Sequence, residues 1–206
     1  MTDAITPTDV GGRPLGQKGA LTRQRLLDAA EGVFAELGYH DASVVKITEA
    51  AGVAQGTFYL YFRSKQELFD ELVRDLNRRV RRAMKAASSV GTTRVEAELL
   101  GFRAFFRFTA EHPALYRIIR QAEFVSPGSL RYHYERLSAG YVEGLTRASA
   151  DGEVGPVDPE VTAWALMGMG ELVGMRWILW EQRDEMPERV VDELARIIAC
   201  VLGSDR

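Results

Sequence analysis

Gln55, Gly56, Thr57 and Tyr59 are near neighbours whose chemical groups suit the base edges and the backbone of a DNA duplex. A glutamine amide can pair bidentately with adenine or donate to guanine, and a tyrosine offers a hydroxyl to a phosphate and a ring to a thymine methyl. Gly56 has no side chain, so the backbone can come close to a partner. Lys65, a little further on, adds a compact positive charge for a phosphate. These groups can act together only if a helix presents them on one face.

The segment 43–65 has the pattern of two short helices around a glycine. Ser43 is placed to cap a first helix that Gly52 ends, and a second helix is predicted over 55–62. The inner arc of the second helix carries Phe58, Tyr61 and Phe62, and its outer arc carries Gly56, Thr57, Tyr59 and Leu60. This layout is typical of a helix-turn-helix reader of double-stranded DNA. The alternative is an amphipathic helix in a plain bundle, which explains neither the short helices nor the outward aromatic residues.

Helical periodicity continues along the rest of the chain, and no convincing period-two strand occurs. Caps, glycines and prolines divide the pattern into helices expected at about 22–37, 64–87, 94–111, 113–124, 130–150, 158–182 and 187–203. A turn is expected at 126–128. The sequence therefore predicts an all-α fold of about nine helices. A flexible arm at 1–20 and a three-helix helix-turn-helix domain at 21–80 precede a larger helical bundle at 81–206.

The composition fits a globular protein of a reducing compartment. Of the 206 residues, 46% are hydrophobic and 27% are charged, and we expect neither a membrane span nor a secretory signal. The single Cys200 cannot form an internal disulfide, which suits the cytoplasm. The net charge is −3, but residues 1–82 carry 12 Lys and Arg against 11 Asp and Glu, whereas 83–206 carry 14 against 18. This balance allows a DNA-binding surface in the first part without requiring one.

The residues in and around the two short helices match a family pattern in register. The matching positions are Gly38, Tyr39, Ser43, Val44, Ile47, Ala50, Ala51, Gly52, Val53, Gly56, Thr57, Phe58, Tyr59, Tyr61, Phe62, Ser64, Lys65 and Leu68. Over about residues 20–80 the chain resembles the DNA-binding domain of the TetR family of bacterial transcriptional regulators. The resemblance implies DNA contacts by Ser43, Val44, Ala54, Gln55, Gly56, Thr57, Tyr59, Leu60, Tyr61 and Lys65.

Three positions bear on these implied contacts. Leu60 stands where the family commonly has histidine or tyrosine, and Thr48 replaces a usual alanine. Because Leu60 cannot form a hydrogen bond, we expect it to contact a thymine methyl. Tyr61 falls on the inner arc of the second helix, which sets it apart from the other implied contacts.

The later helices are unusually rich in aromatic residues. Family resemblance implies a ligand pocket here, and an apolar cavity with few polar groups suits a lipophilic ligand. The predicted lining residues are Phe102, Phe105, Phe106, Tyr116, Ile119, Glu123, Phe124, His133, Leu137, Trp164, Met167 and Glu171. The run 116–134 is similar to family members that sense fatty acyl-CoA or related acids. For each aromatic residue, a place in the hydrophobic core is the alternative.

The last two expected helices are apolar nearly all round, so each needs partners on more than one side. By resemblance to the family, they pair across a two-fold axis into a dimer interface. The predicted contacts are Gly170, Gly174, Trp177, Ile197 and Val201. The 81–206 bundle is therefore predicted to bind a ligand and to dimerise.

These features predict a homodimeric repressor of the bacterial cytoplasm, associated with the nucleoid and bound to a palindromic operator. A small lipophilic effector, such as a fatty acyl-CoA or a related acid, would release it. No cofactor, metal site or catalytic residue is predicted. A helical enzyme and a helical interaction scaffold stay open as alternatives. Scattered histidines and the lack of a catalytic motif disfavour the enzyme, and a scaffold would leave the 43–65 motif unused.

Overall fold

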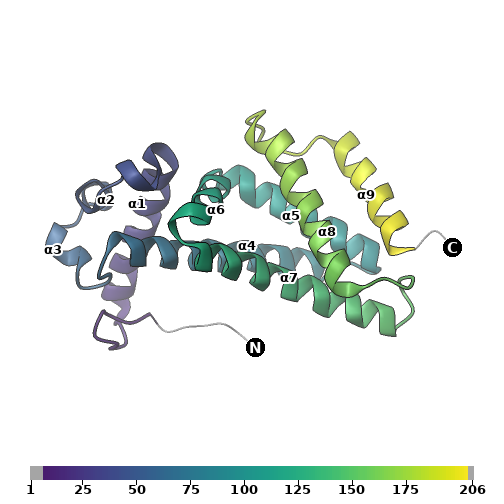
Figure 1. Ribbon diagram of the computed structural model, residues 1–206, viewed down its shortest axis with the longest axis horizontal. Coiled ribbons are helices and arrows are strands. Elements are labelled where there is room, and N and C mark those ends of the chain that lie inside the picture. The colour runs from purple at the N-terminus through teal and green to yellow at the C-terminus, as the bar shows by residue number, and fades with distance from the viewer. Residues whose placement is uncertain (1–6, 204–206) are drawn as a thin grey trace. The chain divides into compact units, whose positions relative to one another are not determined.

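Helices make up the fold. The computed structural model describes residues 7–203, and within this range nine α-helices and one π-helical segment follow one another without a strand (Figure 1). They are α1 Gln17–Asp41, α2 Val44–Ala51, α3 Gln55–Phe58, α4 Lys65–Ser88, α5 Arg94–Glu111, α6 Ala114–Val125, α7 Pro127–Ala150, α8 Pro159–Gly174, the π segment η1 Met175–Leu179, and α9 Glu188–Leu202. The predicted all-α fold is confirmed. In the described range, no helix is both long and apolar enough to cross a membrane.

Side-chain caps begin several helices where the sequence predicts them. The Ser43 hydroxyl accepts a hydrogen bond from the Lys46 amide at 3.2 Å at the start of α2. Thr93 caps α5 in the same way, also at 3.2 Å. The Asp158 carboxylate accepts hydrogen bonds from two amides in the first turn of α8. These bonds satisfy backbone donors that a helix leaves unpaired, and each depends only on residues close together in sequence.

Two helices begin earlier than the sequence predicts. α1 begins at Gln17 instead of near 22, and it is assigned as far as Asp41 although Gly38, at a φ of 76°, bends the chain. α7 begins at Pro127, so the turn predicted at 126–128 is wrong and belongs to the start of a helix. Proline is well tolerated there because its missing amide hydrogen would have had no partner within the helix.

Two helices end earlier than predicted. α3 stops at Phe58, since the Leu60 and Tyr61 amides bond to carbonyls only three residues back and tighten the chain into turns. α8 is α-helical only to Gly174. Beyond it, the Trp180 amide bonds to the Met175 carbonyl five residues back, which is the π-helical pattern.

The chain divides into two compact units, and unit 1 contains the residues up to Asp75 together with 117–130. It includes α1, α2, α3, the first part of α4 and most of α6. Its buried apolar side chains include Leu26, Leu27, Ala30, Phe34, Ile47, Phe58, Phe62, Leu68, Phe69, Leu72, Ile118 and Ala122. The Phe34 and Phe69 rings meet edge to face with centroids 5.4 Å apart. The short helices therefore rest on a continuous aromatic and aliphatic core.

Most of α6 belongs to unit 1 because polar groups join it to α1. The Gln121 side chain accepts a hydrogen bond from the Tyr39 amide at 2.6 Å, and Arg117 donates to the Ala35 carbonyl at 2.7 Å. No local sequence pattern indicates these bonds, since their partners are far apart along the chain. The functional division at residues 80 and 81 stays a prediction.

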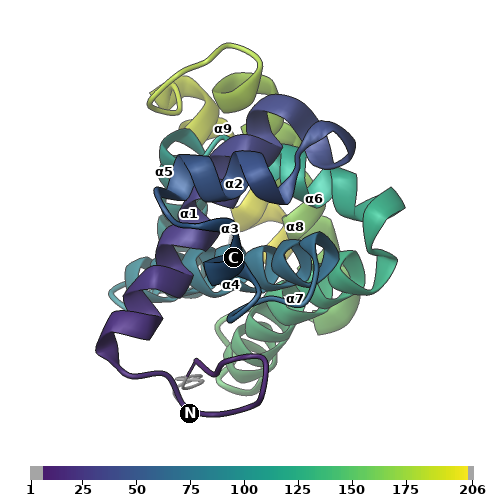
Figure 2. The ribbon, with the colours of Figure 1, turned by 90° about the vertical axis from the view of Figure 1, so that its left-hand side faces the viewer.

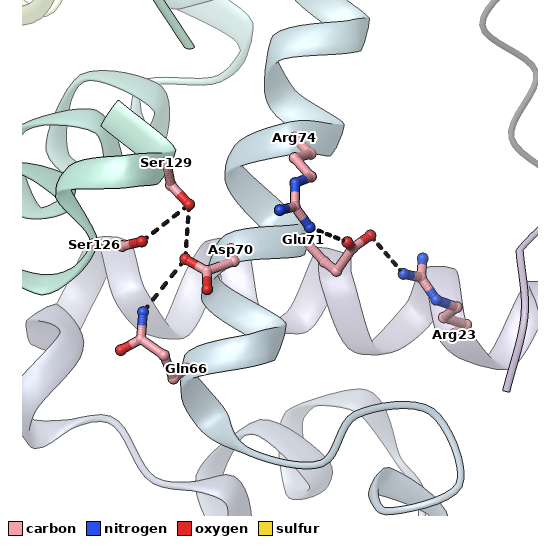
Figure 3. Close-up of polar contacts among 7 residues, drawn as sticks. All are labelled: Arg23, Gln66, Asp70, Glu71, Arg74, Ser126 and Ser129. Carbon is pink, nitrogen blue, oxygen red and sulfur yellow. Dashed lines mark hydrogen bonds and ion pairs between the residues drawn. The ribbon is translucent and has the colours of Figure 1, made fainter. Parts of the chain in front are cut away.

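A carboxylate of α4 holds the start of α7 within the same unit (Figure 3). The Ser129 hydroxyl donates to the Asp70 carboxylate at 2.7 Å, and the Gln66 amide donates to the same oxygen at 3.3 Å. Because hydrogen bonds to charged groups are stronger than neutral ones, Asp70 is a firm link between these two segments.

Unit 2 contains residues 76–116 and the described residues from 131 onward. Its core draws on α5, α7, α8, η1 and α9. The core side chains include Phe102, Phe106, Leu145, Ala148, Ala163, Leu166, Ile178, Val190, Val191, Leu194, Ile198 and Leu202. The amphipathic α9 packs against α5 along one face and ends at Gly203, whose φ of 66° is the left-handed conformation common after helices.

Candidate functional site

The turn between α2 and α3 is fixed by glycine geometry and by an arginine. Gly52 has a φ of 62°, which residues with a side chain rarely adopt. The Arg25 guanidinium donates to the Ala51 carbonyl at 2.6 Å, and the Val53 amide donates back to the Thr48 carbonyl at 3.0 Å. These contacts set the direction in which α3 leaves α2. Thr48, a departure from the family pattern, contributes through its backbone.

α3 and the turn after it have one buried and one exposed side. Phe58 and Phe62 are fully buried, and their ring centroids lie 5.7 Å apart. On the other side, 49% of Tyr59 and 58% of Leu60 remain exposed, large fractions for such side chains. Of the other residues predicted to contact DNA here, Ala54, Gln55 and Gly56 are exposed and Thr57 is half-buried. A helix that binds a DNA groove requires exposed groups on one side and buried apolar side chains on the other.

The absence of a side chain at Gly56 has no explanation in the packing of the protein. A Cβ atom built at Gly56 would meet nothing within 4 Å, and the residue does not have a positive φ. Glycine in a helix is otherwise unfavourable relative to alanine. The bare backbone at this position therefore leaves open space on the outer surface of α3.

An ion-pair network supports the buried side of α3 (Figure 3). The Arg23 guanidinium lies 5.0 Å from the centre of the Phe62 ring and donates to Glu71 at 2.8 Å. Arg74 donates to the other oxygen of Glu71 at 2.6 Å. Burial acts to raise the pKa of Glu71, but the hydrogen bonds from Arg74 and Arg23 outweigh it and lower the pKa. The carboxylate is therefore charged at neutral pH and holds α1 against α4.

The remaining residues predicted to contact DNA have less exposed positions. Ser43, Val44 and Tyr61 are half-buried, and the Ser43 hydroxyl is used in the cap of α2. The Lys65 ammonium donates to the Tyr39 and Ala42 carbonyls, each at 2.7 Å, and burial lowers its pKa. Lys65 thus stabilises the end of α1 and the link from α1 to α2, a structural role that the sequence did not predict. Its contact with phosphate stays a prediction.

Within unit 2, several predicted ligand residues lie in or beside the aromatic core. Phe102, Phe106, Tyr116 and His133 are buried, and Phe105 is half-buried. The Phe105 ring meets the Phe106 ring at 5.9 Å and the Tyr116 ring at 6.2 Å. Burial raises the pKa of Tyr116, so its hydroxyl is protonated at physiological pH.

A chain of hydrogen bonds fixes the protonation of His133. The Asn77 amide nitrogen lies 3.2 Å from His133 Nδ1 and donates to the His133 carbonyl at 3.0 Å. Arg81 donates to the Asn77 side-chain oxygen at 3.0 Å, which fixes which end of the amide faces the ring. Burial lowers the pKa of His133 to about 4. The ring is therefore neutral at pH 7, with Nδ1 as acceptor and Nε2 as donor.

A second polar group joins α7 to α8. The Tyr134 hydroxyl lies 2.9 and 2.8 Å from the two carboxylate oxygens of Glu171, and the Tyr134 ring lies 6.1 Å from that of Trp164. Asn77 and Tyr134 were not among the predicted site residues. Tyr134 directly follows His133, a predicted ligand residue, and this position next to it in the sequence is the signal that could have indicated the tyrosine.

The predicted ligand residues are divided between the two compact units. Ile119, Glu123 and Phe124 belong to unit 1, where Ile119 is buried while Glu123 and Phe124 point outward. Phe124 is 83% exposed, so it does not line the apolar interior of its own unit. Within unit 2, Leu137, Met167 and Glu171 are half-buried, and Trp164 is 45% exposed.

The predicted dimer contacts divide into interior and surface positions. A Cβ atom at Gly170 would lie 2.9 Å from the Phe102 ring, and one at Gly174 would overlap the Tyr116 hydroxyl. Both glycines therefore allow close packing inside this chain, and their place in a dimer interface stays a prediction. Trp177 is half-buried with the Arg176 and Arg189 guanidiniums 5.4 and 5.9 Å from its ring. Ile197 and Val201 are about two-fifths exposed on α9.

Other apolar residues of α8 and η1 are more exposed than those predicted. The large apolar residues left exposed from α8 to α9 are Val161, Trp164, Leu172, Trp180, Ile197 and Val201. We call this set the α8–α9 apolar face. Leu172 at 63% and Trp180 at 62% exposed had no sequence signal that separated them from core residues, because these helices are apolar nearly all round.

A short exposed helix that follows a glycine turn and rests on an aromatic core defines the helix-turn-helix class of DNA-binding proteins. Residues 26–72 match the family described as bacterial regulatory proteins, tetR family. This match covers the helix-turn-helix part of the chain, and for that part it confirms the resemblance predicted from the sequence.

Two relatives from Bacillus subtilis show how far the similarity extends. The chain is 39% identical to the uncharacterized HTH-type transcriptional regulator YdgC over 105 residues, which is 49% of this chain and about half, 54%, of that relative. It is 28% identical to a fatty acid metabolism regulator protein over 162 residues, 69% of this chain and 82% of the relative.

Solved structures of similar fold cover nearly the whole chain. The fatty acid degradation regulator FadR from Bacillus halodurans has a TM-score of 0.78 at 23% identity, covering 94% of this chain and 99% of its own. FadR from Bacillus subtilis in complex with stearoyl-CoA has a TM-score of 0.73 at 23% identity, covering 89% and 99%. At this identity the two structures establish the similarity of fold.

Proposed function

We propose that this protein is a homodimeric repressor that binds a palindromic operator through α3 and leaves it when a lipophilic effector binds unit 2. The observation that carries the DNA-binding part is the exposed face of α3, with Gln55, Gly56 and Tyr59 above fully buried Phe58 and Phe62. Acting on the bacterial chromosome, the protein would work in the cytoplasm, at the nucleoid.

In this proposal the exposed groups of α3 divide the work of recognition. Gln55 reads a base edge, since its amide can both donate and accept. Gly56 allows the α3 backbone to approach the duplex, and the open space around it supports this role. The Tyr59 hydroxyl binds a phosphate, and Leu60 contacts a thymine methyl. Ser43, Val44 and Lys65 would make only peripheral contacts with DNA, because they are partly buried or already hydrogen-bonded.

The α8–α9 apolar face supports the proposed homodimer. It exposes two tryptophans and four aliphatic side chains within one unit, and large exposed apolar surface marks interaction sites. A two-fold dimer places the same patch on both protomers and carries two copies of α3 to two half-sites, so the operator should be palindromic.

The effector is proposed to be a fatty acyl-CoA or a related acid. The names of similar proteins, a fatty acid metabolism regulator and a FadR structure with stearoyl-CoA, support this class. So does the chemistry of unit 2, where the Tyr116 ring meets the Phe105 ring and His133 is buried in its neutral form. An apolar interior with few polar groups suits an acyl chain with a carbonyl group. Release from DNA requires only that the effector bind the DNA-incompetent form more tightly.

The DNA-binding part is tested with a duplex that the wild-type protein selects from a random-sequence library. Gln55→Ala should weaken binding about tenfold or more, because a good base contact contributes about 1–3 kcal/mol. Tyr59→Ala should also weaken binding, because it removes a phosphate contact. Gln24→Ala, an exposed glutamine of α1, is the matched control and should bind as wild type does. Wild-type affinity in both α3 variants would refute the assignment of α3 as the reading element.

The effector part is tested by adding stearoyl-CoA to the protein–DNA complex and measuring fluorescence anisotropy of the labelled duplex. Stearoyl-CoA should lower the anisotropy, whereas coenzyme A alone should leave it unchanged. His133→Gln should raise the stearoyl-CoA concentration required without changing DNA affinity in its absence. Release by coenzyme A alone would contradict a lipophilic effector.

A further inference from the structure

The described residues ahead of α1 form a closed loop. Residues 7–16 turn back on themselves, with the Leu15 amide donating to the Pro7 carbonyl at 2.8 Å and the Asp9 amide to the Arg13 carbonyl at 2.9 Å. The Asp9 carboxylate accepts from the Gly11 and Arg13 amides at 2.8 and 2.9 Å. Hydrogen bonds from Arg13 and Gly11 lower the pKa of Asp9, so this carboxylate is charged at neutral pH.

This loop is attached to the end of the DNA-reading segment. The Val10 amide donates to the Leu60 carbonyl at 3.2 Å, and the Val10 carbonyl accepts from the Arg63 guanidinium at 2.9 Å. Both polar backbone groups of Val10 are thus bound to the stretch that directly follows α3. Figure 2 shows the loop in purple at the start of α1, in the same unit as α3. The sequence alone predicted a flexible arm here.

Arg13 is the basic side chain that the loop presents. Its side chain is 86% exposed, and its contact with Asp9 is a 3.5 Å ion pair of the i,i+4 type. An exposed pair of this kind is weak, so a phosphate can compete for the guanidinium. Arg13 is three residues from Val10, a span of at most about 11 Å. The backbone amides of Gly11, Gly12 and Arg13 already have acceptors inside the loop, so the exposed guanidinium is the charged donor that the loop offers to a phosphate.

We propose that the loop at 7–16 is a second DNA-binding element, in which Arg13 binds a backbone phosphate beside the half-site that α3 reads. The two Val10 hydrogen bonds hold the loop in place before DNA arrives, so little ordering is needed on binding. This proposal rests on DNA binding by α3 and adds a contact outside the helix-turn-helix. A phosphate contact adds affinity on every sequence and increases its dependence on salt.

The test compares two matched ion pairs in the full-length protein. Arg147 and Glu143 also form an exposed i,i+4 pair, with the Arg147 side chain 68% exposed, but they lie in α7 in unit 2. Binding of the wild-type-selected duplex is measured from 50 to 200 mM salt. Arg13→Ala should reduce the slope of log affinity against log salt by about 0.9 per bound protomer. The ratio of wild-type to variant affinity should therefore fall about threefold per protomer across this range. Arg147→Ala should keep the wild-type slope.

Removing the charge of the Asp9 carboxylate, which pairs with Arg13, should change DNA affinity in the opposite direction. Asp9→Asn keeps a side-chain oxygen for the Gly11 and Arg13 amides but removes the charge that competes with phosphate. It should bind the duplex more tightly than wild type, whereas Glu143→Gln, its matched control, should not. If the loop only supported the fold, Asp9→Asn would bind no better and Arg13→Ala would unfold at a lower temperature than wild type.

The outcomes separate this proposal from the proposed function. If the wild-type protein selects no duplex, the proposed function fails. If Gln55→Ala abolishes binding while Arg13→Ala keeps the full wild-type salt slope, α3 reads DNA and the loop proposal is wrong. If Arg13→Ala loses affinity only for particular bases near the half-site, Arg13 contacts a base edge, and the phosphate assignment is overturned.

Discussion

Two glycines close together in the helix-turn-helix should respond in opposite ways to alanine. Gly52→Ala places a side chain at a φ of 62°, and this left-handed conformation costs about 1–2 kcal/mol for a residue with a Cβ atom. The new Cβ atom would also lie 3.2 Å from the Arg25 guanidinium, which holds the Ala51 carbonyl. The free energy of unfolding should therefore fall by about 1–2 kcal/mol.

Gly56→Ala should leave the fold intact or stabilise it by up to about 1 kcal/mol, because alanine is the better helix former and its Cβ atom has open space. The same methyl group would stand between α3 and the duplex. DNA affinity should fall about tenfold, which corresponds to about 1.4 kcal/mol. The loss of affinity would thus occur in a protein at least as stable as wild type.

Urea unfolding followed by circular dichroism gives the stability of both variants, and fluorescence anisotropy with the wild-type-selected duplex gives their affinity. If Gly52→Ala unfolds at the wild-type urea concentration, the left-handed turn is not required. If Gly56→Ala binds the duplex as wild type does, the backbone of α3 does not approach DNA closely, and the role given to Gly56 is refuted.

Three further changes test other parts of the chain. The unfolded chain takes up a proton at His133 near pH 6.5 and the folded chain only near pH 4, so this residue should contribute about 3 kcal/mol of stability above pH 6.5 that is lost as the pH falls to 4. Urea unfolding across this range should show a shallower decline in His133→Gln, and parallel curves would contradict the buried neutral ring. Gly174→Ala should lower stability by about 1–3 kcal/mol through overlap with the Tyr116 hydroxyl. Adding Tyr116→Phe should recover part of the decrease in thermal unfolding temperature, and no recovery would argue against this overlap. Leu172→Glu places a charge on the α8–α9 apolar face and should shift a sedimenting dimer to monomer, whereas an unchanged dimer would place the interface elsewhere.

The sequence predicted best those features that depend on residues close together in the chain. Ser43, Thr93 and Asp158 cap helices where expected, because a capping side chain bonds to amides two or three positions away. The buried side of α3 was also foreseen for Phe58 and Phe62, since their spacing places them on one face. The family pattern adds to these local signals because its positions lie within one short segment.

Features that depend on distant partners were not foreseen. Gly174 was predicted only as a dimer contact, and its close packing against the Tyr116 side chain of α6 was not foreseen. Lys65 looked like a free phosphate anchor, whereas the end of α1 supplies carbonyls that bind it. Periodicity identifies an apolar helix without telling which partner covers each side, and this is why Leu172 was not separated from buried neighbours.

The π segment that continues α8 has a consequence for how proteins of this kind diverge. A π turn holds one residue more than an α turn, so every later side chain is rotated by about 100° relative to a continuous α-helix. Gain or loss of a single residue between Met175 and Leu179 would therefore turn Trp180 to another side while leaving the earlier turns of α8 unchanged. A one-residue insertion or deletion is a short evolutionary route to a new outward surface here, and residue-by-residue alignment of relatives across this point would pair side chains that face different directions.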